Sequence, residues 1–249
     1  MAAALWWGGF AGLPHIAGCR SAASNLPGNL IFAAQMNVTI EGEELTLLPE
    51  RALWWPAHRA LILSDVHWGK SGHFRKHGYA IPGGTQDADA ARLSAIIQRY
   101  KPERLIIAGD LFHSRHNKEV DAFGRWRAAH GGLHIDFIIG NHDILSKDFY
   151  EAQALTIHQE SLLLEPFFIS HDAVQDPQHF TIHGHIHPGV RISGIRPVSL
   201  PAFCFNKTCG VLPAFGAFTG CKAVRLGDYD RIFVIGEGQV LALKGATAS

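Results

Sequence analysis

Three short apolar segments, each ended by a polar cluster, constrain the fold of this chain more than any other feature of its sequence. They are residues 60–64 (ALILS), 104–108 (RLIIA) and 134–139 (HIDFII). Segments of this length that are mostly apolar are typical of buried strands. Residues 85–100 and 118–130 lie between them and have helical character, the second ended by two glycines. This alternation of strands and helices predicts an α/β architecture.

Short strands dominate the rest of the chain. Residues 37–55 alternate in polarity around a turn at Glu41-Gly42-Glu43. A short helix is expected within residues 69–78, before a loop at Gly83-Gly84. From Leu155 onward we expect strands at 155–158, 161–164, 166–170, 179–182, 197–205, 209–213 and 231–243. Since 249 residues fit one domain better than two, we predict a single layered α/β sandwich.

The first 35 residues differ in character from the rest. Residues 1–18 are apolar and rich in glycine, and the first basic residue is Arg20. A secretory signal begins with basic residues instead. Strand alternation starts at Met36. We therefore expect residues 1–35 to be an N-terminal extension, either a mis-assigned start or a weakly ordered arm, and residues 36–249 to form the domain.

Charge and cysteine content narrow the classes of function. Lys plus Arg and Asp plus Glu number 22 each, so bulk charge does not favour a nucleic-acid partner and a local basic patch would have to supply it. No apolar run is long enough to span a membrane. The four cysteines form no CxxC pair, which argues against a zinc ribbon. Free thiols indicate a reducing compartment, and we expect the protein to be cytoplasmic. The cysteines are Cys19, Cys204, Cys209 and Cys221.

The polar clusters that follow the apolar segments are rich in residues that bind metals. Ligand sites in open α/β sheets lie at the carboxyl ends of strands. Carboxylate and imidazole ligands without a thiolate favour Mn, Fe or Zn, with Mg also possible. Two such ions about 3.5–4 Å apart suit an in-line displacement at phosphorus. In chain order the clusters are Asp65-Val66-His67, Gly109-Asp110, Gly140-Asn141-His142-Asp143, His171 and Gly184-His185-Ile186-His187.

The spacing within the clusters gives a first idea of their geometry. In a strand, residues i and i+2 point to the same side, so Asp65 and His67 are expected to reach one metal together. His185 and His187 have the same spacing in a glycine turn, and either can reach a different metal. Glycine before Asp110 allows the backbone to turn sharply, as does the glycine before Asn141.

In this order, DxH, GD, GNHD, a lone His and GHxH resemble the motifs of the calcineurin-like metallophosphoesterase superfamily, over about residues 60–190. The resemblance implies a complete ligand set: Asp65, His67 and His187 for a first metal, Asn141, His171 and His185 for a second, and Asp110 as the bridge. It also implies that His142 stabilises the transition state or protonates the leaving oxygen, and that Asp143 orients His142. A complete set argues against a member that acts only as a scaffold.

Longer segments resemble one bacterial subgroup, the ligase-associated DNA-damage-response phosphoesterases. The subgroup implies a manganese-dependent DNA endonuclease or phosphodiesterase, encoded beside a DNA ligase and a helicase that would be its functional partners. It also implies a four-layer αββα sandwich. The resemblance leaves residues 1–35 outside. Its segments are ALWWPAHRALILSDVHWGK at 52–70, FRKHG at 74–78, IPGGT at 81–85, GDLFHSR at 109–115 and LPAFGAFTGC at 212–221.

Several side chains near the clusters are candidates for binding substrate. His113 follows Asp110 by three residues and either contacts a phosphate or caps a turn. Cations neutralise phosphates, so three basic residues either bind the phosphodiester backbone or are ordinary surface charge. These are Lys70, Arg75 and Arg115. Three tryptophans either stack on bases or pack in the core. They are Trp54, Trp55 and Trp68.

Two other functions stay open on the sequence alone. The fold does not choose the substrate, so a phosphatase or a small-nucleotide phosphodiesterase is the runner-up. A continuous basic track of Lys70, Arg75 and Arg115 that runs away from the metals would favour DNA over it. The third interpretation is a scaffold in a ligase–helicase repair complex. It requires the tryptophans of residues 54–68 and the phenylalanines of residues 214–218 to form an apolar surface patch. The sequence does not indicate an oligomeric state.

Overall fold

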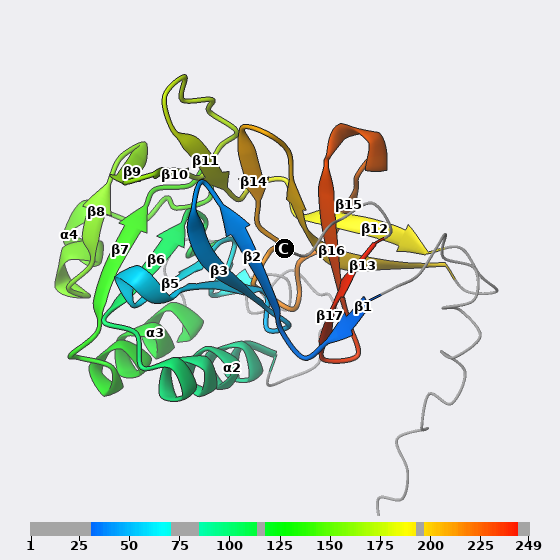
Figure 1. The fold of residues 1–249 in the computed structure, drawn as a ribbon. Coiled ribbons are helices and arrows are strands. Elements are labelled where there is room, and N and C mark those ends of the chain that lie inside the picture. The colour runs from blue at the N-terminus through cyan, green and yellow to red at the C-terminus, as the bar shows by residue number, and fades with distance from the viewer. Residues whose placement is uncertain (1–30, 71–84, 114–117, 193–196, 244–249) are drawn as a thin grey trace, which may run out of the picture.

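The computed structural model describes residues 31–70, 85–113, 118–192 and 197–243, which form two β-sheets and three α-helices (Figure 1). Two predicted substrate contacts, Arg75 and Arg115, lie outside these ranges, as do residues 1–30 and the loop at Gly83-Gly84. Of the short helix expected at 69–78, only Gly69 and Lys70 lie in the described ranges, and Lys70 has helical backbone.

The first sheet has seven strands in the order β2-β3-β4-β5-β6-β7-β8. They are β2 (Met36–Ile40), β3 (Glu43–Leu48), β4 (Ala52–Trp55), β5 (Ala60–Leu63), β6 (Arg104–Ala108), β7 (His134–Ile138) and β8 (Thr156–His158). The short 3-10 helix η3 (Pro56–His58) joins β4 to β5. Strands β5 to β8 are parallel. The carboxyl ends of β5, β6 and β7 therefore share one edge of the sheet, and the polar clusters follow them there.

Helices α2 (Thr85–Tyr100), α3 (Lys118–Ala129) and α4 (Lys147–Ala152) cover one face of this sheet (Figure 1). Leu93 of α2 and Phe123 of α3 are buried with Leu105 and Phe137 of the sheet in one apolar cluster. The predictions of helices at 85–100 and 118–130 are confirmed. Helix α4 was not predicted, because six residues are too few for a periodic pattern. None of the described helices is long and apolar enough to cross a membrane.

The second sheet has ten strands. Eight follow the order β1-β17-β16-β13-β14-β11-β10-β9, and β12 pairs with both β13 and β15. The strands are β1 (Ile31–Ala33), β9 (Ser161–Leu164), β10 (Phe167–Ser170), β11 (Phe180–His183), β12 (Pro188–Ile192), β13 (Val198–Phe205), β14 (Cys209–Val211), β15 (Lys222–Ala223), β16 (Arg231–Gly236) and β17 (Gln239–Ala242). The 3-10 helix η4 (Leu226–Asp228) precedes β16. Strands β10, β11 and β14 are parallel, so their carboxyl ends also share an edge.

Three features of this sheet differ from the sequence prediction. The single strand expected at 231–243 is the hairpin β16–β17, because Glu237 and Gly238 form a turn with φ of 51° and 71°. Strands β12 and β15 were not predicted, since β12 begins with Pro188-Gly189 and β15 has two residues. Strand β1 pairs with β17, so the described sheet includes residues that precede Met36, the boundary we expected.

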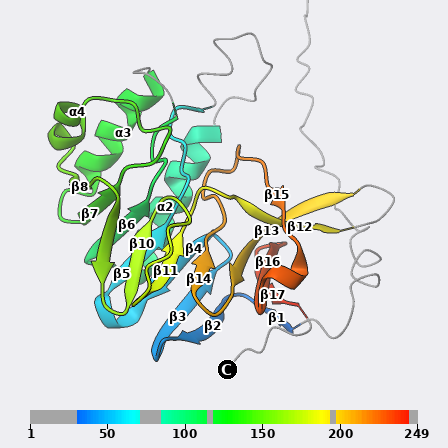
Figure 2. The same ribbon diagram turned by 90° about the horizontal axis from the view of Figure 1, so that it is seen from above.

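The two sheets pack face to face around an apolar cluster that includes Trp55 and Ile138 from the first sheet and Phe167 and Phe233 from the second. The predicted single-domain α/β sandwich is confirmed. Figure 2 shows the helices on one side and β12 and β15 on the other. In the described part of the chain no α-helix covers the outer face of the second sheet, where a fourth layer was expected. That face instead carries a third apolar cluster, which includes Val190 of β12 and Val234 of β16. Residues after β15, such as Val224 and Tyr229, pack against it.

Most of the aromatic residues proposed for a surface patch are buried. Trp55 and Trp68 are 0% and 1% exposed, and Phe215 is also buried. The ring of Trp54 packs at 5.3 Å from that of Tyr100. Phe218 is partly exposed. Core packing therefore accounts for Trp55 and Trp68, and the scaffold interpretation loses the surface patch that it required.

Candidate metal centre

The loops after β5 and β6 bring Asp65, His67 and Asp110 together, although none of the three lies in a strand. Strand β5 ends at Leu63, and the amides of Asp65 and His67 then donate to the carbonyls of Gly109 (3.1 Å) and Asp110 (2.9 Å). The φ angles of Asp65, His67 and Asp110 are 53°, 52° and 51°, in the left-handed region. The strand geometry by which we paired Asp65 with His67 is therefore wrong, although their side chains still lie close together.

Two further predicted ligands share this backbone conformation. His185 and His187 have φ of 66° and 52°. The left-handed conformation costs a residue with a Cβ roughly 1–2 kcal/mol. Such residues gather at functional sites, where the surrounding structure holds them in place. Five left-handed residues at one site indicate that these loops hold particular side chains in fixed orientations.

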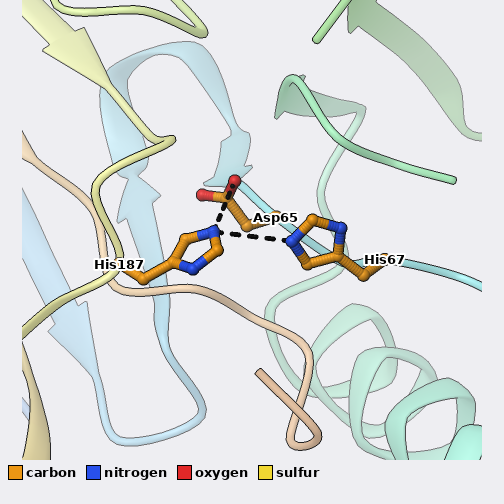
Figure 3. A group of neighbouring side chains, drawn as sticks. All are labelled: Asp65, His67 and His187. Carbon is orange, nitrogen blue, oxygen red and sulfur yellow. Dashed lines mark hydrogen bonds and ion pairs between the residues drawn. The ribbon is translucent and has the colours of Figure 1, made fainter. Parts of the chain in front are cut away.

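Asp65, His67 and His187 form the first cluster (Figure 3). Asp65 Oδ1 lies 3.1 Å from His187 Nε2, which lies 3.4 Å from His67 Nε2. Two ligands bound about 2.1 Å from one ion at angles of about 90–110° are about 3.0–3.4 Å apart. Asp65 Oδ1 is buried and makes no hydrogen bond, while Oδ2 accepts one from the amide of His185 (3.0 Å). These spacings and the unsatisfied carboxylate oxygen fit a divalent cation.

Asn141, His171 and His185 form the second cluster. Asn141 Oδ1 lies 3.0 Å from both His171 Nε2 and His185 Nδ1. The two imidazole nitrogens are 3.1 Å apart. The three ligand atoms thus make a nearly equilateral triangle, again with the spacing of donors around one ion. Asn141 follows β7, whereas His171 and His185 follow β10 and β11, so this cluster joins the two sheets.

Asp110 lies between the two clusters. Its Oδ1 is 3.5 Å from His171 Nε2 in the second cluster, and its Oδ2 is 3.9 Å from His67 Nε2 in the first. Burial raises the pKa of the Asp110 carboxyl, partly opposed by His171 and by the amide of His142, which donates to Oδ1 (2.9 Å). A buried carboxylate with one oxygen toward each cluster suits a bridging ligand, because cations on both sides would offset the cost of its burial.

Hydrogen bonds behind the clusters fix the orientation of two imidazoles. His171 Nδ1 lies 3.1 Å from the carbonyl oxygen of Ala108, to which it can donate, leaving Nε2 as a lone-pair ligand. His67 Nδ1 similarly faces His113 Nδ1 at 3.3 Å. Burial lowers the pKa of His67, and Lys70 and the neighbouring histidines lower it further. Both effects favour the neutral imidazole, which is the form that binds metals.

Three glycines of the motifs are needed for close approach. A Cβ on Gly109, whose φ is 80°, would overlap the ring of His171, and one on Gly140 would overlap the amide and carboxylate of Asp110. A Cβ on Gly184 would lie 2.6 Å from Asp65 Oδ2. The expected sharp turn applies at Gly109. At Gly140 and Gly184 the reason is instead the space that a ligand side chain occupies.

His142 and His113 lie together at the open side of the site. The His142 side chain is 43% exposed, and its Nε2 is 4.0 Å from Asp110 Oδ2. The rings of His113 and His142 are 4.6 Å apart. We expected Asp143 to orient His142, but among the described residues its carboxylate makes its hydrogen bonds to backbone amides and not to the His142 ring. Its two oxygens accept from the amides of Phe112 (2.8 Å) and Gly140 (2.9 Å), and burial raises its pKa to about 8. Asp143 therefore ties together the loops after β6 and β7.

Lys70 is the described member of the three predicted phosphate-binding cations. Its amide donates to the carbonyl of His67 (3.0 Å), which places it next to the first cluster. Burial lowers the pKa of its ammonium, and Asp110 and Asp65 partly restore it. Arg75 and Arg115, the other two cations of the track that would favour DNA, lie outside the described residues.

Sequence reasoning missed one carboxylate at the site. Asp172 Oδ1 lies 3.5 Å from His185 Nδ1, and Asp172 forms a third group of possible ligands with His171 and His185. Its side chain is 65% exposed. The sequence feature that could have identified Asp172 is its position immediately after His171, at the same strand end as that predicted ligand.

Comparison with known proteins agrees with this geometry. The family model described as calcineurin-like phosphoesterase matches residues 58–204, which include every motif from Asp65 to His187. The crystal structure of Pseudomonas putida nuclease MPE is similar, with a TM-score of 0.74 and 32% sequence identity over 84% of this chain and 100% of that chain. No curated protein matches the chain. The family match spans more than half of the sequence, so the chain belongs to the calcineurin-like phosphoesterase family and is a hydrolase acting on phosphoester bonds.

Proposed function

We propose that this protein is a metal-dependent phosphodiester hydrolase with a dinuclear site, and that it cleaves DNA as an endonuclease or phosphodiesterase linked to repair. The observation that carries the proposal is the pair of ligand clusters with Asp110 between them. Asp65, His67 and His187 would hold one ion, and Asn141, His171 and His185 the other. Two divalent ions at such a site supply charge neutralisation and a nucleophile at neutral pH.

In this proposal, His142 is the general acid that protonates the leaving oxygen. A general acid must come within hydrogen-bond reach of the leaving oxygen, and the partly exposed ring beside Asp110 suits that task. His113, with its ring 4.6 Å from that of His142, would contact the same phosphate. Asp143 would act at a distance, by holding the backbone on which Asn141 and His142 are carried.

A nucleic-acid substrate is supported by the nuclease neighbour, which matches over its whole length, and DNA in particular is proposed from the subgroup resemblance. Manganese, and functional partnership with a DNA ligase and a helicase, are proposed from the subgroup resemblance. Lys70 beside the first cluster, with Arg75 and Arg115, would neutralise the phosphate backbone. A cytoplasmic location is proposed because the three cysteines of the described residues form no disulfide.

A cleavage assay on circular single-stranded DNA tests the proposal. The protein is stripped of metal and assayed with Mn²⁺, Mg²⁺ or Zn²⁺, and the matched variant is Asp110→Asn, which keeps the shape of the side chain and removes its charge. We expect Mn²⁺-dependent linearisation by the wild type and none by the variant. Hydrolysis of nucleoside monophosphates without any cleavage of the circle would instead favour the phosphatase interpretation.

A further inference from the structure

A segment outside the ligand motifs touches both loops that supply the first cluster. Residues 214–222 follow β14 and lie beyond the part of the chain that the family model covers. The segment binds the backbone of two of the three residues of the cluster, Asp65 and His187. The hydrogen bonds run from the amide of Phe215 to the carbonyl of Ser64 (2.8 Å), from Gly216 to Asp65 (3.0 Å) and from Lys222 to His187 (2.8 Å).

There is little free space between this segment and the loop after β5. Ala214 forms a bridge with Ser64, and a Cβ built on Gly216 would lie 2.6 Å from the carbonyl oxygen of Val66. Backbone packed this closely transmits a displacement instead of absorbing it. A shift of residues 214–217 therefore moves Asp65, whose left-handed conformation already needs support from its surroundings.

Helix α2 anchors the segment through one buried carboxylate. Both oxygens of Asp89 accept from the amide of Ala217, at 3.2 and 3.1 Å, and the residue is 4% exposed. The guanidinium of Arg92, one turn along the helix, pairs with Asp89 Oδ1 at 2.8 Å. Truncating one partner of such a buried pair leaves the other charge without compensation.

Two arginines hold the carbonyl groups of the same segment. Arg92 donates to the carbonyl of Phe215, and its guanidinium lies 4.3 Å from the centre of that ring. Arg51 donates to the carbonyls of Ala214 (3.3 Å) and Gly216 (3.2 Å). Three carbonyl groups of the segment, those of Ala214, Phe215 and Gly216, therefore accept from arginine side chains.

We propose that Asp89 is a positioning residue for the first metal ion: through residues 214–217 it fixes the loop that carries Asp65. Asp89 contacts neither substrate nor metal in this role. The inference rests on the dinuclear site proposed above, and it predicts that a change in α2 alters the affinity of one ion and leaves the other unchanged.

The test measures Mn²⁺ binding to the full chain by the electron paramagnetic resonance signal of free Mn²⁺, with thermal unfolding recorded in parallel. The wild type is expected to bind two ions. In Asp89→Asn we expect one ion to bind about tenfold more weakly or worse, the range seen when groups behind metal ligands are removed. The matched control is Asp136→Asn, which neutralises another buried aspartate paired with an arginine, Arg104. It should lower the melting temperature and leave both Mn²⁺ affinities at the wild-type values.

A second pair of variants acts on the segment itself, so the test does not depend on Asp89→Asn folding. Gly216→Ala places a Cβ against the carbonyl of Val66, whereas Gly220→Ala, four residues along, meets nothing within 4 Å. Gly216→Ala should weaken the same ion as Asp89→Asn, and Gly220→Ala should behave as the wild type. Combining Asp89→Asn with His67→Ala identifies the ion, because losses at one site are not additive.

The outcomes separate the inference from the function on which it rests. If the wild type binds two ions, and Asp89→Asn and Gly216→Ala bind both with unchanged affinity, Asp89 has a structural role only and the inference is overturned. If the wild type does not bind two ions, the dinuclear function fails first and this inference fails with it. A selective loss of one ion in the folded variants supports both.

Discussion

His142 has a different setting from the residues around it. Its ring is partly exposed beside a buried carboxylate, whereas His67 and His171 are enclosed and oriented from behind. An enclosed imidazole with a fixed partner suits a metal ligand, and a ring with access to solvent suits proton transfer to a substrate. In the proposed function, the motif GNHD would thus supply one ligand and one acid, and its aspartate accepts from backbone amides.

The role of His142 can be tested with two leaving groups. A general acid matters most when the leaving oxygen is a poor one, such as the alkoxide of DNA, and least for p-nitrophenolate, which departs without a proton. We expect His142→Ala to lower kcat/KM for DNA cleavage by about 10²- to 10⁴-fold, and to affect bis-p-nitrophenyl phosphate far less. Equal losses on the two substrates, measured in parallel, would show that His142 does not act as the acid.

Asp172 adds a third carboxylate to a site that already contains Asp65 and Asp110. Its negative charge beside His185 would oppose a phosphate monoester, which is a dianion, more than a diester, which is a monoanion. We expect Asp172→Asn to raise the ratio of monoester to diester kcat/KM and to weaken Mn²⁺ binding by about tenfold. Asp148→Asn, on the exposed start of α4, is the control. An unchanged ratio with unchanged Mn²⁺ affinity would remove Asp172 from the site.

The sequence identified the ligand candidates because residue types that bind metals follow its apolar strands, and because their order resembles the motifs of a known family. It did not predict the backbone conformation of these residues. Five of the candidates are in the left-handed conformation. Aspartate and histidine adopt it more often than most non-glycine residues, but this preference is too weak to predict it at particular positions. The bonds from residues 214–222 to Ser64, Asp65 and His187 join parts of the chain that are far apart, and such contacts arise from the fold as a whole.

Among the secondary-structure elements, those that were predicted well are long or uniformly apolar. Helix α2 was found with its observed bounds, and the apolar strands β5, β6 and β7 were located to within one residue. Helix α4 and strand β15 are too short to show a period, and β12 begins with residues typical of turns. The expected outer helical layer rested on resemblance alone, and in the described residues the strands β12 and β15 lie on that side.

Strands β6, β7 and β8 share a buried carboxylate whose effect on stability depends on pH. Burial alone would raise the pKa of Asp136, but hydrogen bonds from Arg104 (2.5 Å) and with His158 (2.7 Å) outweigh it and hold the pKa below its ordinary value. A depressed folded-state pKa contributes stability above the unfolded-state value of about 3.9, and that contribution is lost as the pH falls through the folded value.

We therefore expect Asp136→Asn to lower the free energy of unfolding by about 2 kcal/mol at pH 7. The difference from the wild type should shrink as the pH falls below about 3.9. Urea unfolding of both proteins at pH 7, 5 and 3, with a chelator present throughout, measures it. A difference that stays constant down to pH 3 would mean that the charge of Asp136 does not contribute.

In the whole molecule, the candidate metal centre lies where the two sheets meet. Asp65, Asp110 and Asn141 come from loops of the first sheet, and His171 and His185 from loops of the second. Ions held by ligands from both sheets bind the folded chain and not the unfolded one. Their binding must then stabilise the fold by mass action, by about 2.7 kcal/mol per site at 100 times the dissociation constant.

The melting temperature should accordingly depend on metal. We expect a chelator to lower it and Mn²⁺ to raise it progressively with concentration, because stabilisation follows ligand concentration. Asp110→Asn should respond to Mn²⁺ less than the wild type, since it lacks the charge between the clusters. A wild-type melting temperature that is the same with chelator and with Mn²⁺ would contradict a centre that joins the sheets.

We propose that this site hydrolyses phosphodiesters with metal ions held around Asp110. The most direct measurement compares bis-p-nitrophenyl phosphate with p-nitrophenyl phosphate, with Mn²⁺ or chelator, for the wild type and Asp110→Asn. We predict Mn²⁺-dependent hydrolysis that favours the diester and falls by about 100-fold or more in the variant, as the loss of several kcal/mol of charge stabilisation implies. Diester hydrolysis that persists in the chelator, or an Asp110→Asn variant as active as the wild type, would contradict the claim.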